Sequence, residues 1–339
     1  MKIKTHYIGI DLGKQSSYFV VKDENGKLLH SSKVFNDRAA IEAALKPYRN
    51  YRLQGVLEAT CNYYWMHQEL FRLGCKVILA HPRKTRAIAD AKVKNDRLDA
   101  NILCDLLRAD LIPQSYIPTE EIRLLRELVR QHIRLVQMRT QIKNQIHSLL
   151  TKLNYQCKVT DLFGKQGRLW LSTLPLPDVF AFQRKQALCQ LDQYNLLIKQ
   201  ADQQIQHALK KFQQAEKLRA IPGIGLLASA MLIAEIGPIE RFPSPKKLAS
   251  YAGITPGLYE SGKTSHQRGI THEGNGYLRW ILCQVTQVHI RKPGPLRQFF
   301  LRLKERIGYT KALIATSRKL LIGIYFVLKG EDFAPTIAG

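Results

Sequence analysis

Several features that would assign this chain to a common class are missing from its sequence. Its six cysteines include no CxxC pair and no spacing typical of metal ligands, so we expect reduced thiols and no disulfide scaffold. Long apolar runs are also missing. Asp11 interrupts the early one, and the later ones near residues 226–234 and 320–328 reach only about nine residues, too short to span a bilayer. We therefore expect a soluble, cytoplasmic protein with no membrane partner.

Acidic residues are the second shortage. Against 52 Lys and Arg the chain has 27 Asp and Glu, a net charge of +25, and the excess recurs in each third of the sequence. A basic surface spread over every segment favours a polyanion contacted along the whole molecule, and nucleic acid is preferred over a merely basic protein. With 339 residues, 45% of them hydrophobic, the chain is long enough for two or three folded domains.

The first apolar run, residues 7–14, predicts a buried strand that delivers one acid, Asp11, to its C-terminal end. A second predicted strand at 53–57 stops at Glu58, and an Asn-Gly hairpin signal separates two β-rich segments between them. Three antiparallel strands, a helix, and then strand, helix and strand is the order of an RNase H-like α/β domain. Many nucleases and transposases share this fold, and actin-like ATPases share it too.

Residues 92–100 open a predicted helix that carries Asp96 and Asp99 three residues apart. Both carboxylates then fall on one face of the first turn, where the helix dipole favours negative charge. Alone, this pair is better explained as an N-terminal cap with a surface acid. With Asp11 and Glu58 it makes a set of four acids that can hold Mg²⁺ on oxygen ligands and polarise a phosphodiester. We find no further glycine-rich phosphate loop of the kind an ATPase needs, which favours a nuclease-like site.

Two long helices are predicted in the middle of the chain, and each has an apolar seventh-residue repeat typical of a coiled-coil arm or a dimer interface. The repeats are Leu128, Leu135, Ile142 and Leu149 in the first helix, and Leu191, Ile198, Ile205 and Phe212 in the second. The first helix also carries a row of arginines that can meet phosphates, although a solvated charged face explains them equally well. They are Arg123, Arg126, Arg130 and Arg134.

The third segment begins with a Pro-Gly-x-Gly turn, Ile221–Gly225, that feeds an apolar helix. This is the helix-hairpin-helix pattern, in which turn amides around Gly223 and Gly225 can bind a DNA phosphate without reading sequence. A tight interhelical turn also explains the glycines. Either way, we expect two helices to meet at this turn.

Residues 257–264 match the P-loop pattern, but a short helix and Thr-Pro precede them where a buried strand is required, so we reject a nucleotide site. A glycine-rich loop remains, in which Lys263 and Arg268 lie near an exposed Ser261 and Arg279 follows on the next helix. Donors and cations around one hydroxyl suit a phosphate clamp or a serine that attacks phosphorus. The residues alone leave both possibilities open.

Together these stretches resemble the DEDD-type insertion-sequence transposases, whose relatives include pilin-gene invertases and recombinases guided by a bridge RNA. The resemblance covers nearly the whole chain in order. Its residues are Gly9–Asp11, Glu58, Lys94–Ala100, Ile221–Gly225, and the block from Ala252 through Ser261 to Arg279.

The resemblance implies three domains: a RuvC-like RNase H-fold catalytic domain at 1–112, a helical coiled-coil arm at 113–217, and a mainly α-helical transposase domain with a helix-hairpin-helix-like turn and the serine loop at 218–339. It also implies that the four acids bind Mg²⁺ and that Ser261 is the nucleophile. Where the family usually has Ser-Ser-Gly-Gly-Lys, this chain has Glu260–Lys263 and keeps only the second serine. Ser250 and Ser265 are the alternative nucleophiles.

The implied activity is cut-and-rejoin recombination between element and target DNA through a phosphoserine link, in a homo-oligomer (dimer or tetramer) whose active sites are shared between protomers. We also expect an element-encoded guide RNA on the first domain and the arm. Three alternatives remain: a junction resolvase or nuclease that hydrolyses DNA through the acids alone, a non-catalytic nucleic-acid-binding regulator with a relic acid site, and an ATPase.

Overall fold

The computed structural model describes residues 4–60, 62–89, 95–261, 264–270 and 273–333. Contacts divide the chain into two compact units, Met1–Ile117 and Pro118–Gly339, and each has its own hydrophobic core. In the described part of the chain no helix is both long and apolar enough to cross a membrane.

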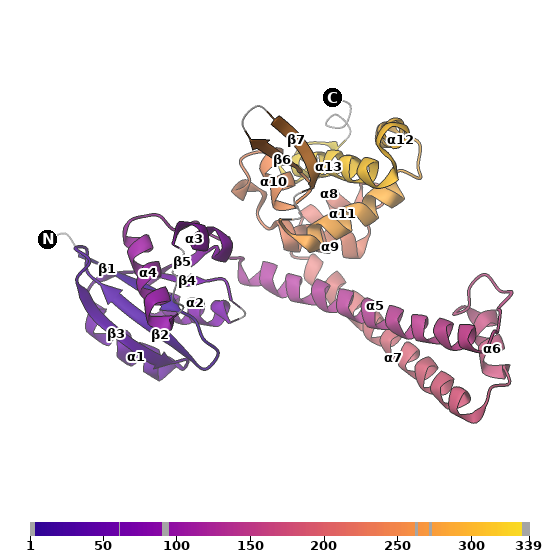
Figure 1. Ribbon diagram of the computed structural model, residues 1–339, viewed down its shortest axis with the longest axis horizontal. Helices are drawn as coiled ribbons and strands as arrows, with labels where there is room; N and C mark the ends of the chain where they lie inside the picture. The colour runs from indigo at the N-terminus through magenta and orange to yellow at the C-terminus, as the bar shows by residue number, and fades with distance from the viewer. Residues whose placement is uncertain (1–3, 61, 90–94, 262–263, 271–272, 334–339) are drawn as a thin grey trace. The chain divides into compact units, whose positions relative to one another are not determined.

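Unit 1 is a mixed α/β unit built on a five-stranded sheet in the order β3-β2-β1-β4-β5 (Figure 1). β2 pairs antiparallel with both β1 and β3, whereas β1, β4 and β5 run parallel. The strands are β1 (Thr5–Asp11), β2 (Ser16–Lys22), β3 (Leu28–Phe35), β4 (Arg52–Glu58) and β5 (Lys76–Ala80). The helices are α1 (Arg38–Leu45), η1 (Lys46–Tyr48), α2 (Tyr63–Arg72), α3 (Pro82–Ile88) and α4 (Asp96–Arg108). This confirms the predicted order of strands and helices.

The two faces of the sheet are covered by different helices because successive strand residues point to opposite sides. Ile8 and Ile10 pack in one core cluster with residues of α1 and α2. On the other face, Val20 and Val56 pack against α4, which buries Ala100, Leu103, Cys104 and Leu107. Asp11 and Glu58 lie two residues beyond Gly9 and Val56 respectively, so both carboxylates belong to the face that α4 covers.

Unit 2 is mostly helical and contains one short two-stranded sheet. Its long helices are α5 (Glu120–Lys152) and α7 (Asp178–Leu209), with α6 (Lys165–Thr173) between them. The remaining helices are α8 (Gln214–Arg219), α9 (Leu226–Ile236), η2 (Ile239–Arg241), α10 (Pro245–Tyr251), α11 (Gly276–His289), α12 (Pro295–Ile307) and α13 (Tyr309–Leu328). α9 is the centre of the core: residues 228–236 are all buried, among side chains of α5, α8, α10, α11 and α13.

The predicted arm forms from α5 and α7, which pack along their lengths (Figure 1). Six residues of the predicted seams are buried, which confirms the seventh-residue pattern as a helix–helix contact: Leu135, Ile142, Leu149, Leu191, Ile198 and Ile205. Leu128 and Phe212 are only partly buried, and Phe212 lies beyond the end of α7, where it packs against the core of the unit.

One local prediction was wrong. The stretch around Ser261 was expected to be an open loop, but it forms a hairpin of β6 (Pro256–Ser261) and β7 (Thr264–Ile270). β-forming residues such as Leu258, Tyr259 and Thr264 populate both strands, whereas the glycines concentrate toward the ends and the connection.

The base of α5 and the end of α7 belong to the same hydrophobic cluster as α9, so both arm helices fall within unit 2. Buried Ile122, Leu125 and Val129 of α5 and Ile205 and Leu209 of α7 make this connection. The finer division of the chain at residues 112 and 217 stays a prediction.

Candidate functional site

Asp11 and Glu58 lie at equivalent ends of neighbouring parallel strands. β1 and β4 are in register with Gly9 opposite Val56 and Ile10 opposite Leu57, so the next position brings Asp11 beside Glu58. Both side chains are half-buried. Parallel strands deliver their last residues to one edge of a sheet, and here that edge carries two carboxylates side by side.

The absence of a side chain at Gly9 lets α4 lie directly on β1. A Cβ at Gly9 would lie 2.0 Å from the carbonyl oxygen of Ala100 and 2.6 Å from the backbone nitrogen of Cys104. Nothing larger than hydrogen fits at this crossing. Cys104 also donates from Sγ to the carbonyl of Tyr7 at 3.3 Å.

The direction of α4 follows from its contacts with successive residues of β1. Asp105 accepts two bonds of 2.7 Å from the nearly buried Nζ of Lys22, and Lys22 pairs with Tyr7 at the beginning of β1. Ala100 and Cys104 then cross Gly9, farther along the strand. α4 therefore runs antiparallel to β1, and its N-terminal turn points toward the strand end that carries Asp11.

That N-terminal turn holds the remaining two acids. Asn95 caps it by accepting from the backbone N–H of Arg97, and Asp96 and Asp99 are the acidic residues of the first turn, as predicted. Asp96 is exposed and Asp99 is half-buried. Among the described residues, however, no three His, Cys, Asp or Glu side chains are grouped closely enough to hold a metal. The structure thus places Asp11 and Glu58 at neighbouring strand ends and directs the first turn of α4 toward them, without grouping the described acids as metal ligands.

Two asparagines that the sequence analysis did not single out fix the loops at this edge. Asn36, after β3, and Asn62, before α2, both donate from Nδ2 to the carbonyl of Gly13, at 2.9 and 2.7 Å. Asn62 follows Glu58 by four residues and Gly13 follows Asp11 by two, so these bonds tie together the chain beyond both acids. No motif signals such residues, because the bond to a carbonyl distant in sequence becomes visible only in the fold.

Ser261 is the last residue of β6, opposite Thr264 of β7, and so lies at the tip of the hairpin. The side chains of Ser261, Ser265 and Arg268 are outside the described part of the structure, as is the whole of Lys263. Ser250 lies exposed on α10.

Arg279 packs against the backbone at the base of this hairpin. Its guanidinium approaches the carbonyl of Ala252 at 3.5 Å, and it packs where a Cβ of Gly253 would lie, 2.7 Å from Nη1. Gly253 has a φ of +69°, a conformation that favours glycine. Arg279 is half-buried, so only part of it is free to meet a phosphate.

The Pro-Gly-x-Gly turn does join two helices, α8 and α9. Gly223 has a φ of +92°, and a Cβ there would lie 3.0 Å from the carbonyl oxygen of Val285 in α11. His289 also bonds the carbonyl of Pro222 through Nδ1 at 2.8 Å. Close packing on α11 therefore explains Gly223. Gly225 differs, because it is exposed with open space around it at the N-terminus of α9.

Of the four arginines on α5 that were predicted to face phosphates, two do not, and the prediction is wrong for them. Arg126 donates to the carbonyl of Ala234 at 2.8 and 3.1 Å, and Arg130 binds both carboxylate oxygens of Glu235 at 2.9 and 3.0 Å. Both guanidiniums point into unit 2 because the core helix α9 packs against this face of α5. Arg134 is exposed and bonded to Gln131, and Arg123 lies near Glu120.

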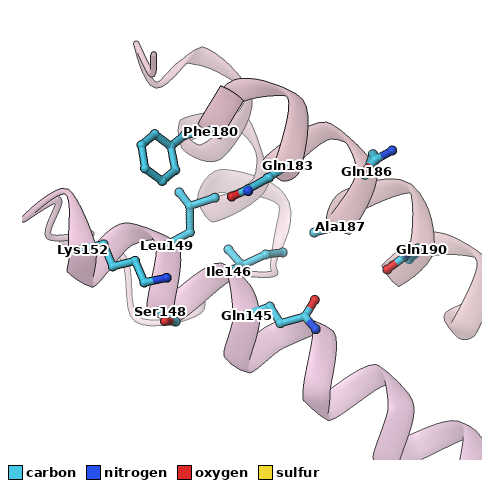
Figure 2. A pocket seen from close by; sticks show the side chains of 10 residues that line it. All are labelled: Gln145, Ile146, Ser148, Leu149, Lys152, Phe180, Gln183, Gln186, Ala187 and Gln190. Carbon is cyan, nitrogen blue, oxygen red and sulfur yellow. The ribbon is translucent and has the colours of Figure 1, made fainter. Parts of the chain in front are cut away.

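A groove with a volume of about 340 Å³ lies between α5 and α7 near the far end of the arm (Figure 2). Its polar lining is made by amides, one hydroxyl and one lysine: Gln145, Ser148, Lys152, Gln183, Gln186 and Gln190. No carboxylate and none of the predicted catalytic residues line it.

Two protein-family models match separate stretches of the chain. Residues 8–155 match a transposase model of the DEDD IS110 type, and residues 215–301 match the model described as the transposase IS116/IS110/IS902 family. The first match contains the four acids and the second contains the serine hairpin. Together the two models cover most of the sequence.

Individual relatives extend the likeness over the full length. An uncharacterized 44.8 kDa protein of insertion element IS116 from Streptomyces clavuligerus is 23% identical over 96% of this chain and 95% of its own. The transposase for insertion sequence element IS1328 from Yersinia enterocolitica is 25% identical over 84% of each chain. The pilin gene-inverting protein of Moraxella bovis is 37% identical, but over 34% of this chain and 37% of its own.

Proposed function

Because this chain belongs to the DEDD transposases of insertion sequences, which are enzymes that act on DNA, we propose that it recombines DNA through two catalytic parts. One part is a carboxylate metal site in unit 1 and the other is a serine nucleophile in unit 2. The observation that supports the proposal is that Asp11 and Glu58 end neighbouring parallel strands, while α4, whose first turn carries two more acids, packs directly on β1.

Unit 1 acts in this proposal as a RuvC-like domain of the RNase H fold. The antiparallel β3-β2-β1 and parallel β1-β4-β5 arrangement supports it, because this order brings the ends of β1 and β4 together. α4 then supplies the Asp96 and Asp99 carboxylates from the face above.

The chemistry of the four side chains suits a hard divalent cation, and Mg²⁺ is the cation we propose. All four offer carboxylate oxygens, the donors that Mg²⁺ prefers. When bound, the ion would polarise a phosphodiester and stabilise charge on the displaced oxygen. Asp11, Glu58 and Asp99 are half-buried and Asp96 is exposed, so a DNA phosphate can reach the edge from solvent.

Ser261 is the proposed nucleophile. Its Oγ attacks a DNA phosphorus and gives up its proton, while the displaced DNA hydroxyl takes a proton and leaves. A hydroxyl of the partner strand then attacks the phosphoserine, releases Ser261 and reseals the DNA. The position of Ser261 at the tip of a hairpin supports this role, because a tip can reach the phosphate of a duplex.

DNA contacts are proposed for the cations around the hairpin and for the exposed turn glycine. In the sequence Lys263 and Arg268 belong to the hairpin segment, and Arg279 contacts its base. α9 begins directly after the exposed Gly225. On α5 the proposed contacts are Arg123 and Arg134, because Arg126 and Arg130 bind Ala234 and Glu235 inside unit 2. We further propose a homo-oligomer, with unit 1 and the arm holding an element-encoded guide RNA; a specific RNA that co-purifies from native cells tests the guide.

A recombination assay on plasmids that carry the element junction and a target tests the proposal, with covalent protein–DNA adducts trapped in denaturing gels. The wild type should form an adduct and recombinant product. Ser261→Ala should lose both, whereas Ser250→Ala and Ser265→Ala, as matched controls, should retain both. Asp11→Asn should lose cleavage while remaining folded.

Two outcomes would replace the proposal by a rival. If Ser261→Ala still cuts DNA and Asp11→Asn does not, the protein is a nuclease that hydrolyses DNA through the acids. If Asp11→Asn keeps every activity, the acid site is a relic.

A further inference from the structure

A fully buried carboxylate at the centre of unit 2 has no part in the chemistry proposed above. Glu235, near the end of α9, has 0% of its surface exposed. Its two oxygens accept bonds from Arg130 at 2.9 and 3.0 Å, and Arg126 Nε lies 3.5 Å away. A charge buried this deeply is tolerated only where surrounding donors satisfy it.

The first set of partners comes from the arm. Arg126 and Arg130 lie one turn apart on α5, so they reach α9 from one face of the arm helix. Arg126 adds two bonds to the carbonyl of Ala234, and Arg130 also lies 4.6 Å above the ring of Tyr277. Figure 1 shows α9 close to α5, and residues of the two helices share one hydrophobic cluster.

The second set of partners comes from the two ends of the hairpin segment. Asn275, which follows β7, donates from Nδ2 to Glu235 Oε2 at 2.7 Å, and Tyr251, which precedes β6, donates from its hydroxyl to the carbonyl of Glu235 at 3.2 Å. Asn275 and Tyr251 also bond each other, backbone to backbone at 2.8 Å and side chain to side chain at 3.3 Å. Glu235 therefore lies where the chain enters and leaves the hairpin.

The backbone segments before and after the hairpin also pack closely against each other, which restricts their movement. A Cβ on Gly274 would lie 2.6 Å from the carbonyl oxygen of Tyr251, so the two chain segments touch. Asn275 uses its Oδ1 to cap α11 at the N–H of Leu278. One carboxamide thus joins the end of the hairpin, the start of α11 and the buried carboxylate.

We propose that Glu235 is a positioning residue that couples arm helix α5 to the base of the hairpin carrying Ser261. Its carboxylate holds Arg126 and Arg130 on one side and Asn275 on the other, so the orientation of the hairpin depends on the arm. The catalytic consequence rests on the function proposed for Ser261. The coupling itself rests only on the contacts of Glu235.

Three variants test the coupling in the full-length protein. Glu235→Gln keeps the shape of the side chain but leaves Arg126 and Arg130 without a buried counter-charge. Asn275→Ser keeps an oxygen that can cap α11 and loses the reach to Glu235. Ser317→Ala is the matched control, because it removes a buried bond of 2.9 Å to Thr286, between α13 and α11, away from Glu235.

The readouts are amide hydrogen exchange, DNA affinity and the rate of the covalent adduct per folded molecule. In Glu235→Gln and Asn275→Ser, the exchange of peptides spanning 251–276 should rise roughly tenfold. The adduct rate should fall by about the same factor while DNA affinity stays within about threefold. Ser317→Ala should lower the melting temperature and leave exchange at 251–276 and the adduct rate unchanged.

A purely structural ion cluster gives a different result: both test variants melt earlier, but exchange at 251–276 and the adduct rate match those of Ser317→Ala. That result overturns the proposal. If Glu235→Gln does not fold, Asn275→Ser decides by the same criteria. If Ser261→Ala still forms the adduct, the proposed nucleophile is wrong, yet the exchange measurement continues to decide the coupling.

Discussion

Replacing Gly9 with alanine should push α4 away from β1 and so disturb the acid site. The new Cβ would lie 2.0 Å from the carbonyl oxygen of Ala100 and 2.7 Å from Cys104 Cβ. A Cβ and atoms of this kind are normally separated by well over 3 Å, so α4 must move away from β1 by about 1 Å. A gap of that size already removes a quarter to a half of the dispersion energy of each contact between them. Because the blocking atoms are backbone atoms and one Cβ, which the backbone fixes, no side-chain rotation relieves the clash.

Overpacking costs about 1–3 kcal/mol in general, and contact with fixed backbone places Gly9→Ala at the upper end, about 3 kcal/mol or more. For a unit of this size that corresponds to a fall of about 10 °C in the melting temperature of unit 1. Scanning calorimetry of the full chain measures it, since the two units have separate cores and can give separate transitions.

Gly55→Ala is the graded control for Gly9→Ala. The atom nearest to its Cβ would be the thiol of Cys75 at 3.1 Å, a side-chain atom, and the next, the carbonyl oxygen of Ile8, lies at an ordinary 3.9 Å, so it should cost less than about 1 kcal/mol. If Gly9→Ala melts within about 2 °C of the wild type, the close contact between α4 and β1 is refuted, and with it the placement of Asp96 and Asp99.

Three further predictions concern the rest of the chain. Burial lowers the pKa of His132 despite the nearby Asp202, so below about pH 6.5 the unfolded chain binds more protons than the folded chain, and unit 2 should lose stability as the pH falls. His132→Gln should reduce this dependence of the melting temperature on pH in calorimetric scans. An equal pH dependence in the variant and the wild type would contradict the assignment of the effect to His132. Burial raises the pKa of Cys75 to about 12 and that of Cys104 to about 11, so a maleimide at about pH 8 should label the exposed Cys189 and spare both until unfolding. Arg130→Ala should destabilise unit 2 by roughly 3 kcal/mol without changing the salt dependence of DNA binding. Arg134→Ala should reduce the slope of log affinity against log salt concentration by up to about 1. The reverse result in DNA titrations at several salt concentrations would show that Arg130 binds a phosphate.

The sequence predicted the elements of unit 1 well because local signals there agree. Asp37 caps α1 by accepting from the backbone N–H of Ala40, Asn95 caps α4, and the strand-end acids follow apolar runs. Their convergence could be inferred from the rule that parallel strands end at one edge. The role of Gly9 could not, because it depends on which helix crosses β1.

Most of what the sequence did not predict involves a residue whose partner lies far along the chain. Arg126 and Arg130 look like a charged solvent face in sequence, and only the packing of α9, about a hundred residues later, turns them inward. Asn62 reaches Gly13 in the same way. The hairpin around Ser261 was missed for a different reason, since its glycines resemble those of a loop and its strands are short.

The most direct test of the acid site is the binding of Mn²⁺, as a spectroscopic substitute for Mg²⁺, to the full-length protein by electron paramagnetic resonance. Asp11→Asn and Asp99→Asn should each weaken binding by about tenfold or more. Asp110→Asn is the control, because Asp110 is exposed and its φ of +54° suits asparagine. Equal Mn²⁺ affinity in the wild type, Asp11→Asn and Asp99→Asn would contradict a metal site shared by β1 and α4.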